Sequence, residues 1–245
     1  MLILLPPSET KSEGGDGALD PASLSFPSLR GRRRAAAAAL RRVPLQDAPA
    51  LLKLGRTNAH EAAWNRVLTS GPTRPAIERY TGVLYDGLDA ASLDDGGRAW
   101  IERHVVIASA LFGLLGAGDR IPRYRLSGST ALPGLSLKAH WRDAVADALA
   151  GTGEWVLDAR SAAYAALGAA PVGSALLHVE TAEGRALNHF NKHAKGALTR
   201  RLAETRAEVG SRDDLLAWAA SAGVPLEPRG PADVVLRVEQ APLRR

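Results

Sequence analysis

The chain has 245 residues, of which 46% are hydrophobic and 23% charged, a composition ordinary for a folded protein with a sizeable core. Its longest apolar stretch, residues 104–118, is interrupted by glycines and is shorter than the ~18 residues that a membrane span needs. The N-terminus also lacks the order of a secretory signal, so we expect a cytoplasmic protein with no membrane partner. The absence of cysteine excludes disulfides and thiolate metal sites, and the net charge of +5 favours an anionic partner.

Strand patterns occur, in chain order, at residues 2–5, 104–110, 154–159, 174–180 and 233–239. The first two are continuous apolar runs, which are typical of strands buried on both faces of a sheet. The last alternates, with Val235, Arg237 and Glu239 opposite its apolar positions, and this predicts a half-exposed edge strand.

Helical patterns lie between the strands, at residues 29–42, 48–70, 74–88, 95–104, 137–151, 189–206 and 211–223. The first of these is an alanine block surrounded by arginines, and we interpret it as a basic surface helix that aids solubility. Together the elements predict one α/β domain over residues 1–245, with mixed α+β character and a mixed sheet flanked by helices.

Polar side chains follow the first strand directly. Pro6 and Pro7 cannot continue a central strand, so Ser8, Glu9, Thr10 and Lys11 lie where the chain leaves the sheet. Ligand sites of α/β sheets form at such carboxyl ends, which predicts a binding role for these residues. A capping turn, in which Ser8 or Thr10 satisfies backbone donors, is the structural alternative.

A second polar set, Arg123, Tyr124 and Arg125, follows three closely spaced glycines. Two arginines beside a tyrosine can bind phosphate and stack on a base, although an edge strand with its arginines in water would give the same pattern. Metal and hydrolase patterns are absent: His189 and His193 lack the intervening glutamate of a metalloprotease helix, and no GxSxG sequence occurs. We therefore expect no metal and no cofactor.

The penultimate helical segment carries Lys192, Lys195, Gly196 and Arg200 on one predicted face. Such a face suits phosphate or carboxylate. A glycine inside a helix costs about 1 kcal/mol relative to alanine, so Gly196 indicates that another group comes close, either a ligand or a second helix.

Six blocks in order, LILLPPSETK, YTGVLYDGL, SALFGLLGAGDRIPRYRL, HWRDAV, VLDARSAAYAAL and FNKHAKGALTRRL, resemble the YaaA family of bacterial peroxide stress resistance proteins. The resemblance implies a single-domain fold particular to that family, a positively charged cleft, and a helix-hairpin-helix-like element associated with DNA binding. That element would lie at residues 74–93, where Gly82 and Gly87 would let backbone amides approach phosphates. Tight helix packing would require the same glycines. The resemblance also points to Lys192, Lys195 and Gly196, which match a KxxKG pattern of the family.

Two functions remain open. The first is a DNA-binding stress protein of the YaaA type that limits peroxide and iron damage, with double-stranded DNA or another phosphate-bearing ligand held by a larger set of residues: Ser8, Thr10, Lys11, Gly82, Gly87, Arg123, Arg125, Lys192, Lys195, Gly196 and Arg200. The second is an enzyme acting on a small anionic or heterocyclic substrate, such as a nucleotide or nucleoside. Its catalytic set would be Glu9 as general acid or base, with Tyr124, Ser161 and Lys195. Many relatives carry a lysine, within SPAKT, where this sequence has Glu9.

Overall fold

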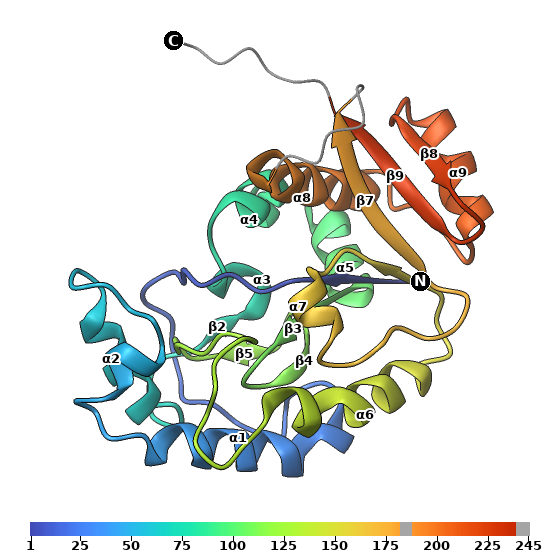
Figure 1. The fold of residues 1–245 in the computed structure, drawn as a ribbon. Coiled ribbons are helices and arrows are strands. Elements are labelled where there is room, and N and C mark those ends of the chain that lie inside the picture. The colour runs from blue at the N-terminus through green and yellow to red at the C-terminus, as the bar shows by residue number, and fades with distance from the viewer. Residues whose placement is uncertain (182–187, 239–245) are drawn as a thin grey trace.

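The computed structural model describes residues 1–181 and 188–238, with only the backbone at 188–190. Seven strands of this part form one sheet in the order β4-β3-β1-β6-β7-β9-β8 (Figure 1). The five inner strands run parallel, and the two outer strands pair antiparallel with their neighbours. The α/β fold predicted from the sequence is confirmed. The strands are β1 (Leu2–Leu5), β3 (Val105–Ser109), β4 (Gly113–Gly116), β6 (Val156–Asp158), β7 (Ala175–Thr181), β8 (Leu226–Arg229) and β9 (Asp233–Val238).

Each of the five predicted strands is present, and both continuous apolar runs are buried along their whole length. The prediction that 233–239 forms an edge was wrong. Strand β9 lies between β7 and β8, and Val235 on its supposedly exposed face is buried. Strand β8, which the sequence reasoning did not identify because Pro228 and charged residues dilute its pattern, covers that edge instead. Glu239 lies outside the described residues.

Two further strands, β2 (Arg74–Pro75) and β5 (Arg120–Ile121), pair as a separate small sheet. The helices are α1 (Arg30–Arg42), α2 (Ala48–Leu51), α3 (Ala76–Arg79), α4 (Val83–Leu88), α5 (Asp95–His104), α6 (Leu137–Ala150), α7 (Ala162–Ala165), α8 (Asn188–Glu204) and α9 (Arg212–Ser221). Short 3-10 helices occupy Pro27–Leu29, Ala59–Arg66 and Ala90–Ser92. None of the helices described here is long and apolar enough to cross a membrane.

Figure 1 shows α1 and α6 along one side of the sheet and α4, α5 and α8 along the other. The predicted helix over 48–70 is broken: α2 ends near Lys53, which adopts a left-handed conformation, and a 3-10 helix follows after Gly55. The helix over 29–42 is confirmed as α1, but Arg33 is buried within it and donates hydrogen bonds to the carbonyls of Phe112, Leu114 and Ser25. That arginine ties α1 to β4.

Helices α4 and α8 pack backbone against backbone. A methyl group at Gly196 of α8 would overlap the carbonyl oxygen of Leu84 in α4, and one at Gly87 of α4 would overlap the carbonyl oxygen of His193. Only glycine permits such a close approach along both helices. The interpretation of Gly196 as facing a ligand is therefore corrected: it faces α4, and Gly87 has the same packing role.

Arg200 belongs to this helix contact as well. Its guanidinium donates to the carbonyls of Leu88 and Asp89 and to the hydroxyl of Ser92, and it pairs with Glu204 in its own helix. Carbonyls at a helix C-terminus lack partners within the helix, so Arg200 satisfies the end of α4. The structure thus engages Arg200 in a cap rather than leaving it open to a ligand.

We predict that Gly196→Ala lowers the free energy of unfolding by at least about 1–3 kcal/mol, because the added methyl group must push α4 away from α8. Urea denaturation measures the change. The matched control is Gly31→Ala in α1, where the new methyl group meets open space. There, higher helix propensity should leave stability unchanged or raise it by up to about 1 kcal/mol. Equal effects of the two substitutions would contradict the packing role of Gly196.

Candidate functional site

The order in which the chain adds strands to the sheet reverses at β1. Strand β3 pairs with β1 on one side and β6 pairs with it on the other, all three in parallel. Loops leaving the carboxyl ends of two such strands separate and open a crevice, which is where open α/β sheets bind ligands. In this protein the segments that leave this point are those after Leu5 and after Asp158.

A pocket of about 520 Å³ occupies this crevice. Four segments line it: the loop after β1, the start of α4, the loop after β6 with α7, and the first described side chains of α8. The lining residues are Pro6, Pro7, Ser8, Glu9, Thr10, Thr81, Gly82, Val83, Leu84, Tyr85, Ala159, Ser161, Tyr164, Asn191, Lys192 and Lys195. Seven predicted site residues therefore meet in one hollow: Ser8, Glu9, Thr10, Gly82, Ser161, Lys192 and Lys195.

The loop after β1 is held against the start of α4. The Thr10 hydroxyl donates to the carbonyl of Thr81, and the hydroxyls of Ser8 and Thr10 lie 3.1 Å apart. Gly82 has a φ of 99°, a conformation that favours glycine, and a methyl group there would come within 3.2 Å of the Thr10 hydroxyl oxygen. This part of the pocket wall is thus backbone and hydroxyl, without bulky side chains.

Two lysines of α8 face the pocket in different environments. Lys192 is exposed, whereas Lys195 is only 9% exposed and its ammonium nitrogen donates to the carbonyl of Ala159 at 2.9 Å. Burial lowers the pKa of Lys195, and the nearby Asp158 carboxylate opposes that shift. Asp158 itself already has a partner, since it forms a buried bidentate ion pair with Arg160.

All four tyrosines of the chain are buried around this site. The Tyr85 hydroxyl donates to the carbonyl of Pro6, and the hydroxyls of Tyr80 and Tyr124 lie 2.7 Å apart. The Ser109 hydroxyl oxygen, 2.8 Å from that of Tyr124, also accepts backbone N–H groups after β3. Together with Tyr164, these rings form the rigid base on which the loop after β1 rests.

Lys11 lies beneath that loop. Its ammonium nitrogen donates to the carbonyls of Ser8 and Glu9 and lies 4.3 Å from the centroid of the Tyr124 ring. Burial lowers the pKa of Lys11 to about 7, although Glu9 opposes the shift. Lys11 does not line the pocket. It therefore shapes the loop and does not face a ligand there.

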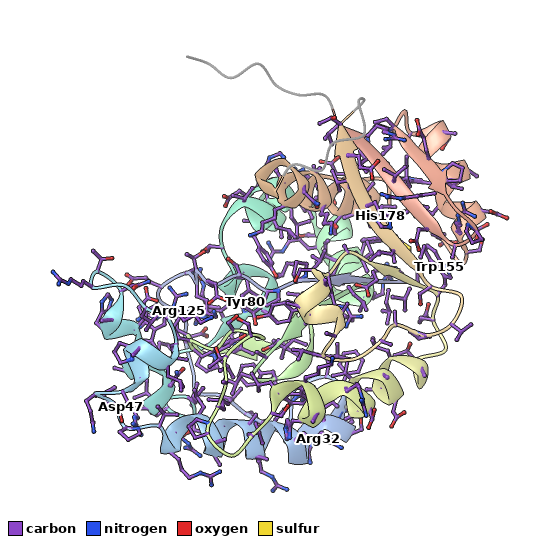
Figure 2. The ribbon with its side chains drawn as sticks, in the orientation of Figure 1. Arg32, Asp47, Tyr80, Arg125, Trp155 and His178 are labelled. Atoms are coloured by element: carbon purple, nitrogen blue, oxygen red, sulfur yellow. The ribbon has the colours of Figure 1, made fainter. Side chains whose placement is uncertain are left out.

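The arginines predicted to bind phosphate have other partners. Arg125 is buried and pairs with Glu61 and, at 3.3 Å, with Glu9. Arg123 pairs with Glu13, and its guanidinium stacks over Trp64 at 4.6 Å. Figure 2 shows Arg125 and Tyr80 between α2 and α3 in that view. The edge-strand alternative is wrong, because residues 122–126 form no strand, and in this structure both arginines pair with carboxylates.

Two of the predicted catalytic residues are also placed differently from expectation. Tyr124 is 1% exposed and lies outside the pocket lining, because its hydroxyl is enclosed by Tyr80 and Ser109. Glu9 lines the pocket, but its side chain is 58% exposed and paired with Arg125. Ser161 and Lys195 do line the pocket together.

The sequence reasoning missed Asn191 and Tyr85, which also line the pocket. Asn191 directly precedes Lys192 on α8, so the face assigned to the lysines carried the signal. Tyr85 had no such signal, because a tyrosine in an apolar helix reads as core. Among the residues that the structure describes, no three histidine, aspartate or glutamate side chains gather to hold a metal ion.

Comparison with known proteins places the chain in a family. The family sequence model described as "Peroxide stress protein YaaA" matches residues 1–223. The chain belongs to the YaaA peroxide stress protein family. A UPF0246 protein of Corynebacterium efficiens is 44% identical over 237 residues, covering 93% of this chain and 95% of the relative. A UPF0246 protein of Streptomyces coelicolor is 40% identical, covering 95% and 94%.

The match extends beyond the blocks on which the resemblance rested. It includes the loop after β1, the α3–α4 region, the loop after β6 and α8, so every wall of the pocket lies within the part of the chain matched to the YaaA family. The pocket is thus a feature of the segment that defines family membership.

Lys11 gives stability a specific pH dependence. Its pKa is about 7 in the folded protein and near 10.5 when unfolded, so between these values the unfolded chain binds more protons and stability rises with pH. From about pH 7 to about pH 9 we expect the free energy of unfolding to rise by roughly 2 kcal/mol relative to that of Lys11→Met. Urea denaturation of both proteins at several pH values measures it. Parallel pH profiles would contradict a buried, easily deprotonated Lys11.

Proposed function

We propose that this YaaA-family protein acts in peroxide stress by binding double-stranded DNA, or another phosphate-bearing ligand, through the pocket at the carboxyl ends of β1 and β6. The observation that carries the proposal is the pair Lys192 and Lys195 of α8, which line a pocket together with the hydroxyl-bearing residues Ser8, Thr10 and Ser161. Phosphate contacts of this kind supply affinity without reading base sequence.

The charge balance of the pocket supports an anion. Within the described part of the chain, the Lys192 ammonium has no ion-pair or hydrogen-bond partner, and neither the Ser161 hydroxyl nor the Asn191 side-chain amide has one. Glu9 is the only carboxylate among the described lining residues, and Arg125 pairs with it. The uncompensated charge of the lining is therefore positive, and its free polar groups are available to phosphate oxygens.

The element expected to resemble a helix-hairpin-helix corresponds to α3 and α4, joined by Tyr80–Gly82. In this proposal the backbone around Gly82, at the pocket wall, approaches a phosphate. Gly87 has no such part, because α8 covers it. The DNA backbone would thus follow the rim formed by the start of α4 and the start of α8.

The alternative function, an enzyme acting on a small anionic or heterocyclic substrate such as a nucleotide, draws support from the volume of the pocket, which suits a small molecule. The catalytic mechanism proposed for this enzyme has no such support. Glu9 is exposed and paired with Arg125, so it lacks the apolar, water-excluding surroundings that are typical of a catalytic carboxyl group. DNA binding is therefore the better-supported function.

If Lys192 contacts a phosphate, Lys192→Ala should weaken binding of a labelled duplex and lower the slope of log affinity against log salt by about one unit. Fluorescence anisotropy at several salt concentrations measures both quantities. The double variant Lys192→Ala/Lys195→Ala should lower the slope further if both amines meet phosphates.

Lys138→Ala is the matched control, because Lys138 is exposed on α6 and lies outside the pocket. Its salt slope should equal that of the unchanged protein. The same loss of slope in Lys138→Ala as in Lys192→Ala would show diffuse attraction to a basic surface and would contradict the pocket as the binding site.

A further inference from the structure

The chain uses lysine sparingly. Of its 31 basic side chains only five are lysines, at positions 11, 53, 138, 192 and 195, and the remainder are arginines. Two of the five line the pocket, and a third lies beneath its loop. Arginine binds phosphate at least as well as lysine, so a need for positive charge alone does not explain lysine here. Lysine differs in that its amine loses a proton and then acts as a nucleophile.

Lys195 has the surroundings of such an amine. It is buried, and its one hydrogen-bond partner among the described residues is a neutral carbonyl, that of Ala159. Asp158, the nearest carboxylate that influences it, is bound in two places by Arg160. A buried ammonium without a paired carboxylate is costly, and burial lowers the pKa of this group, so its amine loses a proton more readily than that of a lysine exposed to water.

The amine also stands between two hollows. A second cavity, of about 590 Å³, lies beside β7, and Ser161, Asn191 and Lys195 line both it and the first pocket. Lys195 thus borders space in two directions. Ser161 and Asn191 bring polar side chains to the lining of the same two cavities.

Lys11 differs in this respect. Its amine is buried too, but it is enclosed by two carbonyls and the Tyr124 ring and lines neither cavity. Lys192, in turn, is exposed to water. Among the lysines near the site, Lys195 alone is both buried and open to a cavity, within the part of the chain that the structure describes.

We infer that Lys195 is a nucleophile that captures a carbonyl: its amine forms an imine with the aldehyde of a phosphate-bearing ligand seated in the pocket. The inference rests on the proposed binding of phosphate there. It assigns the two lysines of α8 separate roles, with Lys192 holding the phosphate and Lys195 bonding to the carbon.

The chemistry balances without a further reactant. The Lys195 nitrogen attacks the aldehyde carbon, and the C–N bond forms as the carbonyl π bond opens. The resulting alkoxide takes the proton that the nitrogen gives up, and loss of water then leaves the imine. Ser161 lines both cavities together with Lys195, and in this scheme its hydroxyl relays that proton.

The ligand class is an aldehyde that also carries a phosphate ester. A ring-opened deoxyribose that has lost its base is one such group within DNA, and a free phosphorylated aldehyde is another. Both present the same two features to the pocket, an anion for Lys192 and an electrophilic carbon for Lys195, so the two sources are separated by experiment.

The test traps the imine with cyanoborohydride, which reduces it to a stable secondary amine. One arm uses pyridoxal 5′-phosphate, and the other a duplex oligonucleotide with one base-less deoxyribose. Peptide mass spectrometry then locates the adduct. We expect it at Lys195, and we expect Lys195→Arg to lower the yield by about tenfold or more, since arginine stays protonated. Adduct only with the oligonucleotide assigns the ligand to DNA, and adduct with pyridoxal 5′-phosphate assigns it to small phosphorylated aldehydes as well.

Lys138→Arg is the matched control and should keep the full yield, because Lys138 lies outside both cavities. Lys195→Gln, with circular dichroism of every variant, guards against a loss caused by misfolding. Pyridoxal without its phosphate should react less at Lys195, which reports the role of the phosphate.

Adducts spread evenly over the five lysines, or a yield unchanged in Lys195→Arg, would overturn the inference. Anisotropy with intact duplex, which contains no aldehyde, tests DNA binding separately. A Lys195 adduct without duplex binding would leave the capture of carbonyls standing and remove DNA as the partner. Duplex binding without any adduct would support DNA binding and overturn the capture of carbonyls by Lys195.

Discussion

The close contact between the backbones of α4 and α8 determines where the two lysines that line the pocket lie. Because Gly87 and Gly196 have no side chains, the two helices approach until each meets the carbonyls of the other. That approach fixes Lys192 and Lys195 opposite the start of α4 and beside the loop after β1. Arg200 satisfies the end of α4 from the same helix, so one surface of α8 both joins the helices and presents the pocket's charges.

Desolvation then distinguishes lysines that are chemically identical. Lys192 is in water, Lys195 borders two cavities, and Lys11 is enclosed under the loop. Transfer of an ammonium from water into protein disfavours its charged form, and the size of that effect depends on burial and on nearby carboxylates. The buried ion pair of Asp158 and Arg160 matters here, because Asp158 is bound by Arg160 and only partly offsets the effect of burial on the pKa of Lys195.

Glu9 stands where the resemblance to the YaaA family led us to expect a lysine, and the structure shows how the chain accommodates the acidic side chain. Arg125 pairs with the Glu9 carboxylate while also pairing with Glu61, and the Lys11 amine binds the Glu9 carbonyl from below. Two cations therefore lie beside the substituted position. The acidic side chain is neutralised locally, and the positive character of the pocket is left to the lysines of α8.

The sequence by itself determined the α/β class, the positions of five strands and those of most helices, because apolar periodicity and strand length record burial locally. It also indicated the loop after β1 and the lysines of α8, since polar residues at a strand end and a glycine within a helix are visible without a structure. A glycine within a helical pattern looks the same in the sequence whether it faces a ligand or another helix, so the sequence could not separate these two cases.

Only the tertiary structure decided the roles of Gly196, Arg200, Arg125 and Tyr124. Each makes its contacts with residues distant in the chain: Gly196 with Leu84, Arg200 with Leu88, Arg125 with Glu61, and Tyr124 with Tyr80. The charge or hydroxyl of a side chain is written in the sequence. Whether that group is free to meet a ligand depends on which partners the fold brings within hydrogen-bonding distance, and on how much water the fold removes from it.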